Sequence, residues 1–594
     1  MSQLDLIGFS SSFEAGPRSR FTYRDLRNLR RSSTTCPLRV IALIDFDAFY
    51  AQCESVRLGL SPDQPLCVQQ WNIVIALNYA AKAAGLKRII SPDEAKLKCP
   101  EVILQHVATW REGDTSWAYR PDVRQHMKTD KAALDPYRLQ SRKAFELIKS
   151  RLPPAPVQKV EKASIDEVFL DLSAQVYEVI IQRYPNLLGT IEAQDDGKLL
   201  PPPPTSVLDW DVDNLIAAEA DVEADFPDWD DVSVNIGAEI VREVRHDIFK
   251  VLQYTCSAGI ARNKTLAKLA AGHNKPNQQT VVRARAVDAF YSGYKFTKIR
   301  GLGGKLGQHV VKAFDTDQIS KLLDLSLQDM RTALGSSGPW VYNVIRGNEY
   351  AEVVERTQLQ SMLAAKTFVP KAKDLEHAEK WLRIFAGDLM GRLEEQDVAS
   401  GNRRPGVIAL YHAIEGRFGP TRSKQMQIPR GAEINTKLLF DLSRTLLIRL
   451  SHEGPTWPCL EISVSLNDFQ DAVSNNHYMT TFFAPELRTK DPVKLVEPRL
   501  DEVVEANNTD VQMKRKLSCP DSDLPAPAKK FQASPAEDLV VALGNGTSTT
   551  CGDGAKPNLY CCPKCNTHLD NASVLEHLDW HIAKELRDAW SQQR

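Results

Sequence analysis

Two strand-like segments that carry acidic residues constrain the fold of this chain more than any other feature. Residues 40–44 form an apolar run too short for a helix, and the run ends at Asp45 and Asp47. Residues 163–172 alternate in the manner of a strand and carry Asp166 and Glu167. Carboxylates on buried strands are costly unless they are paired or bind a cation. The chain must therefore supply a partner or a cation to both strands.

Two interpretations of these acids are open. Adjacent strands that present acids side by side can hold two magnesium ions about 3.5–4 Å apart, which stabilise the attacking and leaving oxygens of a phosphoryl transfer. For either position alone, an acid that caps a turn at a strand end is the more common case. The sequence Asp-Phe-Asp-Ala-Phe-Tyr at 45–50, combined with Ser-Ile-Asp-Glu at 164–167, is more specific and favours the metal site.

The charge is spread unevenly, so the near-neutral total does not exclude a nucleic-acid partner. The chain carries −2 overall, but residues 185–235 hold thirteen acids and one base, a net of −12, and residues 501–594 carry −4. The rest of the chain therefore carries +14. The acidic segment after the prolines at 201–204 is expected to be an outer surface insertion with little regular structure, so that deleting 200–230 would be tolerated.

Length and composition predict several soluble domains. A chain of 594 residues exceeds a single core, and no apolar run reaches the ~20 residues of a membrane span, so no membrane partner is expected. The cysteines at 36, 53, 67, 99, 256 and 459 are expected to be reduced and buried. Helices are expected at 138–150, 236–252 and 436–451, and strands at 406–414 and 459–466.

Three blocks of sequence resemble the Y family of translesion DNA polymerases, and they occur in the same order as in that family. They are residues 44–50, residues 163–167, and residues 256–264 together with 274–277. The resemblance covers about 38–490. It implies an α+β multidomain fold: a right-hand polymerase (palm with a mixed β-sheet, small fingers and a helical thumb), a little-finger domain, and a C-terminal ββα zinc finger.

The resemblance also implies domain boundaries. These are a loose N-terminal extension at 1–37, a palm at 38–47 and 117–282 with the acidic insertion at about 185–235, fingers at 48–116, a thumb at 283–352, a little finger at 360–498, a disordered linker at 499–555, and a zinc finger at 556–594.

The same resemblance implies roles for the acids. Asp45, Asp166 and Glu167 would be the catalytic ligands of two Mg²⁺ ions, for which Mn²⁺ could substitute, with the Phe46 main-chain carbonyl as a further ligand. Asp47 matches no ligand of the family, and we expect it to form hydrogen bonds within a turn. Glu54 is a weaker candidate for an additional acid near the site.

Six residues match the nucleotide-binding positions of the family. Tyr50 would be the steric gate, whose ring excludes a ribose 2′-OH by a clash. Tyr79, Lys82 and Lys275 match triphosphate-binding residues, although the family commonly has Arg where this chain has Lys82, so that the charge is kept and the bidentate fork is lost. Gln70 and Arg88 match fingers residues that lie against the templating and incoming bases.

A glycine-rich turn at 299–307 points to a DNA contact and to one branch of the family. Such a turn exposes backbone N–H groups to a phosphate, as a helix-hairpin-helix does, and makes Gly301, Gly303 and Lys305 DNA-binding candidates. Taken alone, a plain turn is the more common case. Together with residues 272–277 and the insertion before Ile236, it resembles the eta branch in its fungal-like eukaryotic form, which copies past ultraviolet-induced pyrimidine dimers.

Two alternatives are open. One is another Y-family branch, such as a kappa-like or iota-like polymerase. The other is a non-catalytic scaffold that binds ubiquitin and DNA, against which the complete set of acids argues. The implied reaction is attack of a primer 3′-OH on the α-phosphate of a dNTP, on primer–template DNA, with release of pyrophosphate.

The C-terminus carries a zinc-ligand pattern. Cys562, Cys565, His577 and His581 have the spacing C-x2-C-x11-H-x3-H, which suits one tetrahedral Zn²⁺, and so short a segment cannot fold without the metal. The neighbouring Cys561 fits this spacing less well.

The finger is expected to bind protein rather than DNA. Its expected helix at 572–586 is acidic, which makes a poor phosphate binder. It resembles the ubiquitin-binding finger of the eta branch, in which Asp579 matches the ubiquitin-contacting acid and Ile582 belongs to an adjoining apolar patch. The linker would tether the polymerase near a ubiquitinated sliding clamp. Basic residues at 514–516 and 529–530 are spaced like a bipartite nuclear localisation signal and predict the nucleus.

Overall fold

The fold is that of a computed structural model of the chain. The structure describes residues 19–188, 197–204, 208, 210, 213–216, 227–355, 359–400, 403–414, 421–471, 560–562 and 567–569, with the backbone alone at 396–400, 471 and the last two ranges.

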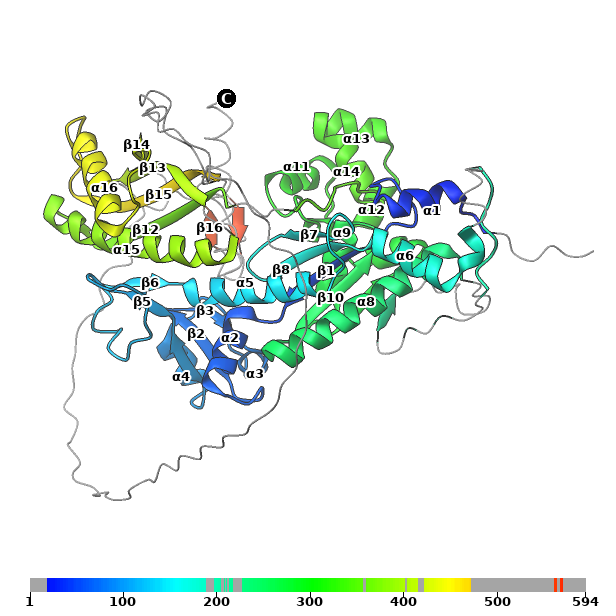
Figure 1. Ribbon diagram of the computed structural model, residues 1–594, viewed down its shortest axis with the longest axis horizontal. Helices are drawn as coiled ribbons and strands as arrows, with labels where there is room; N and C mark the ends of the chain where they lie inside the picture. The colour runs from blue at the N-terminus through cyan, green and yellow to red at the C-terminus, as the bar shows by residue number, and fades with distance from the viewer. Residues whose placement is uncertain are drawn as a thin grey trace, which may run out of the picture. The chain divides into compact units, whose positions relative to one another are not determined.

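A six-stranded mixed sheet forms the central layer (Figure 1). Its order is β7-β8-β1-β10-β11-β9, and β1 pairs antiparallel with both β8 and β10. Strand β10 runs parallel to β11, which runs parallel to β9. The strands are β1 (Ile41–Phe46), β7 (Lys159–Lys162), β8 (Glu167–Asp171), β9 (Asn214–Ile216), β10 (Cys256–Ala261) and β11 (Gln279–Val282).

Strand β1 is buried on both faces because its side chains alternate between two cores. Ala42 and Ile44 face one core, which is formed with α1 (Tyr23–Arg30), α5 (Asp135–Ser150), α6 (Ser173–Arg183) and α8 (Trp229–Leu252). Ile41 and Leu43 face the other core, with α9 (Lys264–His273) and the helices that follow it. This double burial explains the continuous apolar run before Asp45.

A second, three-stranded sheet of order β3-β2-β4 follows β1 along the chain. Its core contains Cys67, Val74 and Ala95. The elements are α2 (Phe49–Leu58), β2 (Leu66–Gln70), β3 (Ile73–Leu77), α3 (Tyr79–Ala83), α4 (Pro92–Lys98) and β4 (Ile103–His106), followed by the separate pair β5 (Ala108–Trp110) and β6 (Lys131–Ala133).

A helical region follows the central sheet. Its elements are η3 (Ala284–Ala286), α10 (Val287–Ser292), η4 (Phe296–Lys298), α11 (Lys305–Phe314), α12 (Ile319–Leu323), α13 (Leu327–Leu334), η5 (Gly335–Ser337) and α14 (Gly338–Val344).

A four-stranded sheet of order β12-β15-β13-β14 then packs against two helices. These elements are β12 (Ser361–Ala372), α15 (Leu375–Ser400), β13 (Arg403–Ala413), β14 (Thr421–Gln427), α16 (Thr436–Ser451) and β15 (Cys459–Asp471).

Several sequence-based expectations are confirmed. The three expected helices are present within α5, α8 and α16, and the two expected strands overlap β13 and β15. The cysteines at 36, 53, 67, 99, 256 and 459 are buried and free. Among the helices that the structure describes, none has the length and apolarity to cross a membrane. The strand expected over 163–172 is shorter: β8 begins at Glu167, and the preceding residues turn back from β7.

The expectation of a loose extension at 1–37 is wrong for residues 19–37. Thr22 and Asp25 form a capping box that starts α1. Leu26 and Leu29 are fully buried in the core that α6 shares, so α1 is an integral helix of the central unit. Arg20 adds an ion pair of 2.9 Å to Asp230.

The acidic insertion is also not wholly a surface loop. Strand β9 extends the central sheet, and α8 begins at Trp229, before the position expected from the sequence. Asp231 is fully buried, pairs with Arg283 at 2.8 Å and also pairs with Arg285. A count of charges along the chain cannot see these distant arginines. The structure argues against a tolerated deletion of 200–230, which would remove β9 and Trp229.

We predict that Trp229→Ala lowers the free energy of unfolding by ~3–5 kcal/mol. The side chain is 1% exposed and its indole N–H donates to the Pro201 carbonyl at 2.7 Å, so truncation leaves a large cavity and an unpaired acceptor. Denaturant unfolding of the full chain measures the change. Phe249→Ala, on the same helix but 49% exposed, is the control and should change the midpoint little. Equal midpoints for both variants would contradict the assignment of Trp229 to the core.

Candidate active site

Strand register brings the predicted acids together at one end of the central sheet. Asp45 of β1 lies directly opposite Glu167 of β8. The Phe46 N–H donates to the Asp166 carbonyl at 3.0 Å, which holds the turn before β8 against β1. Three acidic residues, from two segments that are distant in sequence, therefore lie at one edge of the sheet.

Two lysines face this cluster of acids. Lys268 Nζ of α9 lies 2.5 Å from Glu167 Oε1, and Lys275 Nζ donates to Asp45. Ser164 Oγ donates to Asp166 Oδ1 at 2.6 Å. Burial raises the pKa of Asp45 to about 6, against the opposing effect of Lys275, and the charges of Glu167 and Asp166 raise it further. A half-buried carboxylate in this environment favours a nearby cation.

The donor set suits a hard divalent cation by its chemistry. Mg²⁺ prefers carboxylate and carbonyl oxygens, which Asp45, Asp166, Glu167 and the Phe46 backbone supply. Within the described part of the chain, no three acidic, histidine or cysteine side chains are gathered closely enough to hold an ion. Lysines engage two of the three carboxylates in this arrangement. Cation binding would therefore exchange lysine contacts for metal contacts.

Asp47 has the structural role expected from the sequence. It is 2% exposed and accepts hydrogen bonds from Ser257 Oγ and from the Asn277 N–H, both at 2.8 Å. Asn277 adopts a left-handed conformation (φ 54°), which asparagine tolerates better than most residues. Asp47 thus anchors the turn at 274–277 that carries Lys275.

Glu54 is not an additional acid of the cluster. It is fully buried and accepts hydrogen bonds from the hydroxyls of Tyr119 and Tyr137, both at 2.7 Å, and it pairs with Arg57 at 2.7 Å. These three donors use the carboxylate inside the protein. The weak sequence expectation for Glu54 is therefore wrong, because sequence proximity to Asp45 does not report which way helix α2 turns its residues.

Tyr50 forms a fixed aromatic wall next to the acids. Its ring stacks on Tyr137, with centroids 4.2 Å apart and planes 12° apart. The Tyr137 hydroxyl is held by Glu54, so the stack is anchored in the core. Burial raises the pKa of Tyr50, and Asp166 is among the charges that act on it, which places the residue beside the cluster.

Helix α3 presents the next two predicted residues. Asn78 caps the helix by accepting from the Ala81 N–H at 2.9 Å, and Lys82 Nζ lies 4.1 Å from the centre of the Tyr79 ring. Burial lowers the pKa of Lys82 and the charge of Lys275 lowers it further, while Asp47 opposes both effects. Burial raises the pKa of Tyr79 to about 12, with smaller contributions from Asp47 and Asp45.

The charge of Arg88, like that of Lys275, lowers the pKa of Lys82. Lys82 therefore lies near two other predicted cations, Lys275 and Arg88. Gln70 stands apart from them, at the end of β2, where it lines a cavity of 710 Å³ together with Trp71 and residues of β12.

The glycine-rich turn forms a tight junction between η4 and α11. Gly301 has φ +91°, and a Cβ there would lie 3.1 Å from the Trp340 ring. A Cβ at Gly307 would lie 1.7 Å from the Leu302 carbonyl oxygen, so α11 packs directly on the turn. Gly303 and Lys305 are exposed there, next to the free N–H groups of the helix start. None of the contacts between described residues joins this turn to the acids.

The C-terminal segment is described only as a hairpin. Strand β16 (Tyr560–Cys562) pairs antiparallel with β17 (Thr567–Leu569), and Cys562 lies opposite Thr567. Cys565, His577, His581, Asp579 and Ile582 lie outside the described residues, as do the helix expected at 572–586, the linker at 499–555 and its basic residues.

Sequence reasoning missed Lys268, which neutralises Glu167, and Tyr137, which supports Tyr50. A signal for Lys268 existed in the run of small residues at 256–261. A Cβ at Gly259 would lie 2.1 Å from the Ala267 carbonyl oxygen, so α9 packs against β10 in a way that only glycine allows. That close approach carries Lys268 to the start of β8, where it contacts Glu167.

Family models match four stretches of the chain. They are the impB/mucB/samB family at residues 44–272, the DNApol eta/Rev1 HhH motif at 296–348, the impB/mucB/samB family C-terminal domain at 359–479, and the Ubiquitin-Binding Zinc Finger at 558–589.

Three curated relatives are similar to the chain. N-acetyltransferase eso1 of Schizosaccharomyces pombe is 34% identical, over 95% of this chain and 64% of that protein. DNA polymerase eta of Saccharomyces cerevisiae is 28% identical, over 96% of this chain and 92% of that protein. DNA polymerase eta of Arabidopsis thaliana is 32% identical, over 63% of this chain and 52% of that protein. The chain spans less than two thirds of the first and third of these relatives, and the acetyltransferase activity in the first name is not carried over.

We predict that Asp47→Ala lowers the free energy of unfolding by about 2 kcal/mol, because the buried Ser257 hydroxyl loses its acceptor and the 274–277 turn loses its anchor. Thermal unfolding of the full chain measures this effect. Asp63→Ala removes an exposed aspartate and serves as the matched control. If both variants melt together, Asp47 does not anchor the turn.

Proposed function

This chain belongs to the Y family of DNA polymerases, the impB/mucB/samB family, and from that membership we propose that it is a template-directed DNA polymerase that carries out translesion synthesis. The observation that carries the proposal is the register that sets Asp45 against Glu167, with Asp166 at the adjoining turn. Its substrates would be primer–template DNA and dNTPs.

The proposed domains follow the sheets. The central sheet would be the palm, the three-stranded sheet with α2–α4 the fingers, the helical region at 283–352 the thumb, and the four-stranded sheet with α15 and α16 the little finger. The matches at 296–348 and 359–479 support the last two assignments. The thumb turn with Gly301, Gly303 and Lys305 would contact a DNA phosphate through the backbone at the start of α11.

The proposed mechanism assigns each residue a task around the reacting phosphates. Asp45, Asp166, Glu167 and the Phe46 carbonyl would hold two Mg²⁺ ions, which supply charge stabilisation for phosphoryl transfer. Lys275, released from Asp45, would join Lys82, Tyr79 and Arg88 in binding the triphosphate. Gln70 would lie against the templating base, and Tyr50 would exclude a 2′-OH because its ring is held by Tyr137. The primer 3′-OH would attack the α-phosphate, and pyrophosphate would leave.

Within the family, we favour the eta branch. The helix-hairpin-helix model that matches the chain is named for eta and Rev1, and two of the three relatives named above carry the name DNA polymerase eta. The lesion would then be a pyrimidine dimer. The competing branch assignment, kappa or iota, differs in what it inserts opposite such a dimer.

We predict that the wild-type chain extends a primer and inserts two adenines opposite a cyclobutane thymine dimer. Asp166→Ala and Asp45→Ala should each lower the rate by at least about 10³-fold, because a ligand and its charge are lost from the site. Chelation of divalent cations should abolish extension, and added Mg²⁺ or Mn²⁺ should restore it. Gel-resolved primer extension measures all three effects.

Asp63→Ala is the control and should extend normally. Full activity of Asp166→Ala would contradict the metal assignment. Normal extension on undamaged DNA, with failure opposite the dimer, would contradict the eta assignment alone.

We also propose that the C-terminal finger binds one Zn²⁺ through Cys562, Cys565, His577 and His581, and binds ubiquitin through Asp579 and Ile582. The match to a ubiquitin-binding zinc finger at 558–589 supports this, together with the β16–β17 pair, whose first strand contains Cys562. The partner would be ubiquitin or a ubiquitinated sliding clamp, and the place of action the nucleus.

We predict that Cys565→Ser abolishes binding of the chain to immobilised ubiquitin, because a structural zinc finger unfolds when one of its ligands is lost. Primer extension should be unchanged. Pull-down and zinc quantification measure the effect. Replacing the exposed Asp63 by Ala leaves both properties intact. Retained ubiquitin binding without zinc would contradict the proposal.

A further inference from the structure

The β2–β3 hairpin carries a large aromatic residue where the backbone disfavours one. Trp71 follows Gln70 and has φ 56°, in the left-handed region that two-residue hairpins usually fill with Asn or Gly. The strained position is held in place: the Trp71 N–H donates to His106 Nε2 at 2.8 Å, and the two rings pack with centroids 5.0 Å apart. Backbone strain that is held in place in this way is typical of residues with a functional side chain.

Trp71 borders two cavities that continue into a third. One measures 710 Å³ and is lined by Gln70, Lys128 and Lys366, and the next measures 300 Å³ and is lined by His106 and Arg124. Trp71 and Met127 line both, and His106 and Arg124 in turn also line a third cavity, of 360 Å³. We call these three adjoining cavities the Trp71 furrow. Its largest part has the volume of a typical small-ligand site.

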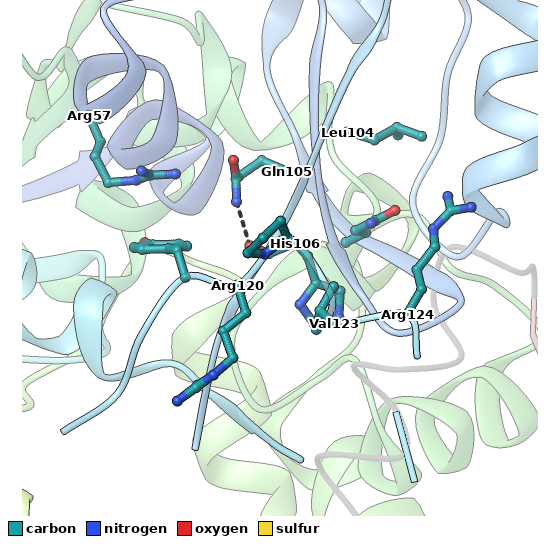
Figure 2. Close-up of a pocket in the computed structure, with 10 residues that line it drawn as sticks. Arg57, Leu104, Gln105, His106, Arg120, Val123 and Arg124 are labelled. Carbon is teal, nitrogen blue, oxygen red and sulfur yellow. Dashed lines mark hydrogen bonds between the residues drawn. The ribbon is translucent and has the colours of Figure 1, made fainter. Parts of the chain in front are cut away.

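The third cavity brings further arginines to the furrow (Figure 2). Arg57 and Arg124 lie on opposite sides of Gln105 and His106, whereas the Arg120 guanidinium points away from both. Arg57 and Arg120 are paired with Glu54 and Asp114. Arg124 is exposed, and no carboxylate of a described residue lies within ion-pair distance of it.

Two more cations in the furrow lack a carboxylate partner among the described residues. Lys128 is exposed and lies four residues after Arg124. Lys366 Nζ donates to the Asp130 carbonyl at 3.0 Å and lies 4.9 Å from the Trp71 ring and 4.5 Å from the Trp381 ring. Burial lowers the pKa of Lys366 to about 8, and nearby Lys131 lowers it further. One acid, Asp93, lines the furrow, in the 300 Å³ cavity.

We propose that the Trp71 furrow receives the unpaired template strand on the 5′ side of the templating base. One base would stack on the Trp71 indole, and the phosphates would lie against Lys128, Lys366 and Arg124. A basic groove with an aromatic platform is how proteins bind single strands without sequence preference. The proposal rests on the proposed function, because it takes the path of the template from Gln70, the residue next to Trp71.

The other role for Trp71 is packing alone, in which its ring clamps Lys366 and holds the hairpin against β12. The two roles differ in what they predict for the length of the template overhang. A clamp would affect every primer–template equally. A stacking platform would affect only templates that have an unpaired base beyond the templating position.

The test measures binding of two primer–templates, one with a single unpaired template nucleotide and one with about six. The wild-type chain should bind the longer overhang about tenfold more tightly, and Trp71→Ala should reduce that ratio severalfold, because the stacking contact is lost while the phosphate contacts remain. With 2-aminopurine placed at successive overhang positions, wild type and Trp71→Phe should quench its fluorescence at one position, and Trp71→Ala should not.

Charge is tested with Arg124→Ala and Lys128→Ala. Each should reduce the slope of log Kd against log salt by about 0.7 for the longer overhang, as expected for one lost phosphate contact on a single strand. Phe249→Ala and Lys250→Ala, which remove an exposed aromatic and an exposed lysine on α8, are the matched controls and should preserve both the ratio and the slope.

If Trp71→Ala weakens both templates equally, or keeps the wild-type ratio while lowering the melting temperature, Trp71 is a packing residue and the proposal is wrong. The binding assays contain no dNTP. Failure of the proposed polymerase activity would therefore appear in primer extension and would leave the binding ratio interpretable.

Discussion

The site depends on the repulsion between like-charged carboxylates at one end of the central sheet. Asp45, Asp166 and Glu167 meet because β1 pairs in register with β8, and burial next to two other carboxylates raises the pKa of Asp45 to about 6. Such a cluster persists only if cations face it. Lys268 and Lys275 take that place, and each reaches it through a separate packing device: the close approach of α9 to β10 at Gly259, and the turn anchored by Asp47.

The same constraint links the fold to the proposed chemistry. Lysines are mobile point charges that exchange partners more readily than a bidentate arginine does. Lys275 lies between the carboxylates and the cations on the α3 side, so metal ions entering the cluster would free it to bind phosphate. The surrounding walls do not share this mobility, because Tyr50 stacks on Tyr137 and Tyr137 is held by a fully buried Glu54. Rigid walls around exchangeable charges suit a site that repeatedly binds triphosphate and releases pyrophosphate.

Local sequence predicted the elements whose signals are local. The apolar run before Asp45 and the leucine pattern of α16 need only neighbouring residues to be recognised, and both elements are present. Where partners are distant, the prediction failed. The sequence predicted Asp231 to be a surface charge, whereas the structure pairs it with Arg283 and Arg285. The burial of Leu26 against α6 was likewise not predicted. Glu54 shows the same limit, because burial is set by packing that no short window of sequence contains.

Asp45, Asp166 and Glu167 can be tested as one cation site by titrating Mn²⁺ into the chain bound to primer–template and a non-hydrolysable dNTP, with bound ions counted by electron paramagnetic resonance. We expect two bound ions for the wild type and loss of binding for Asp166→Ala and Glu167→Gln, with Asp63→Ala unchanged. Equal Mn²⁺ binding by the wild type and both site variants would contradict it.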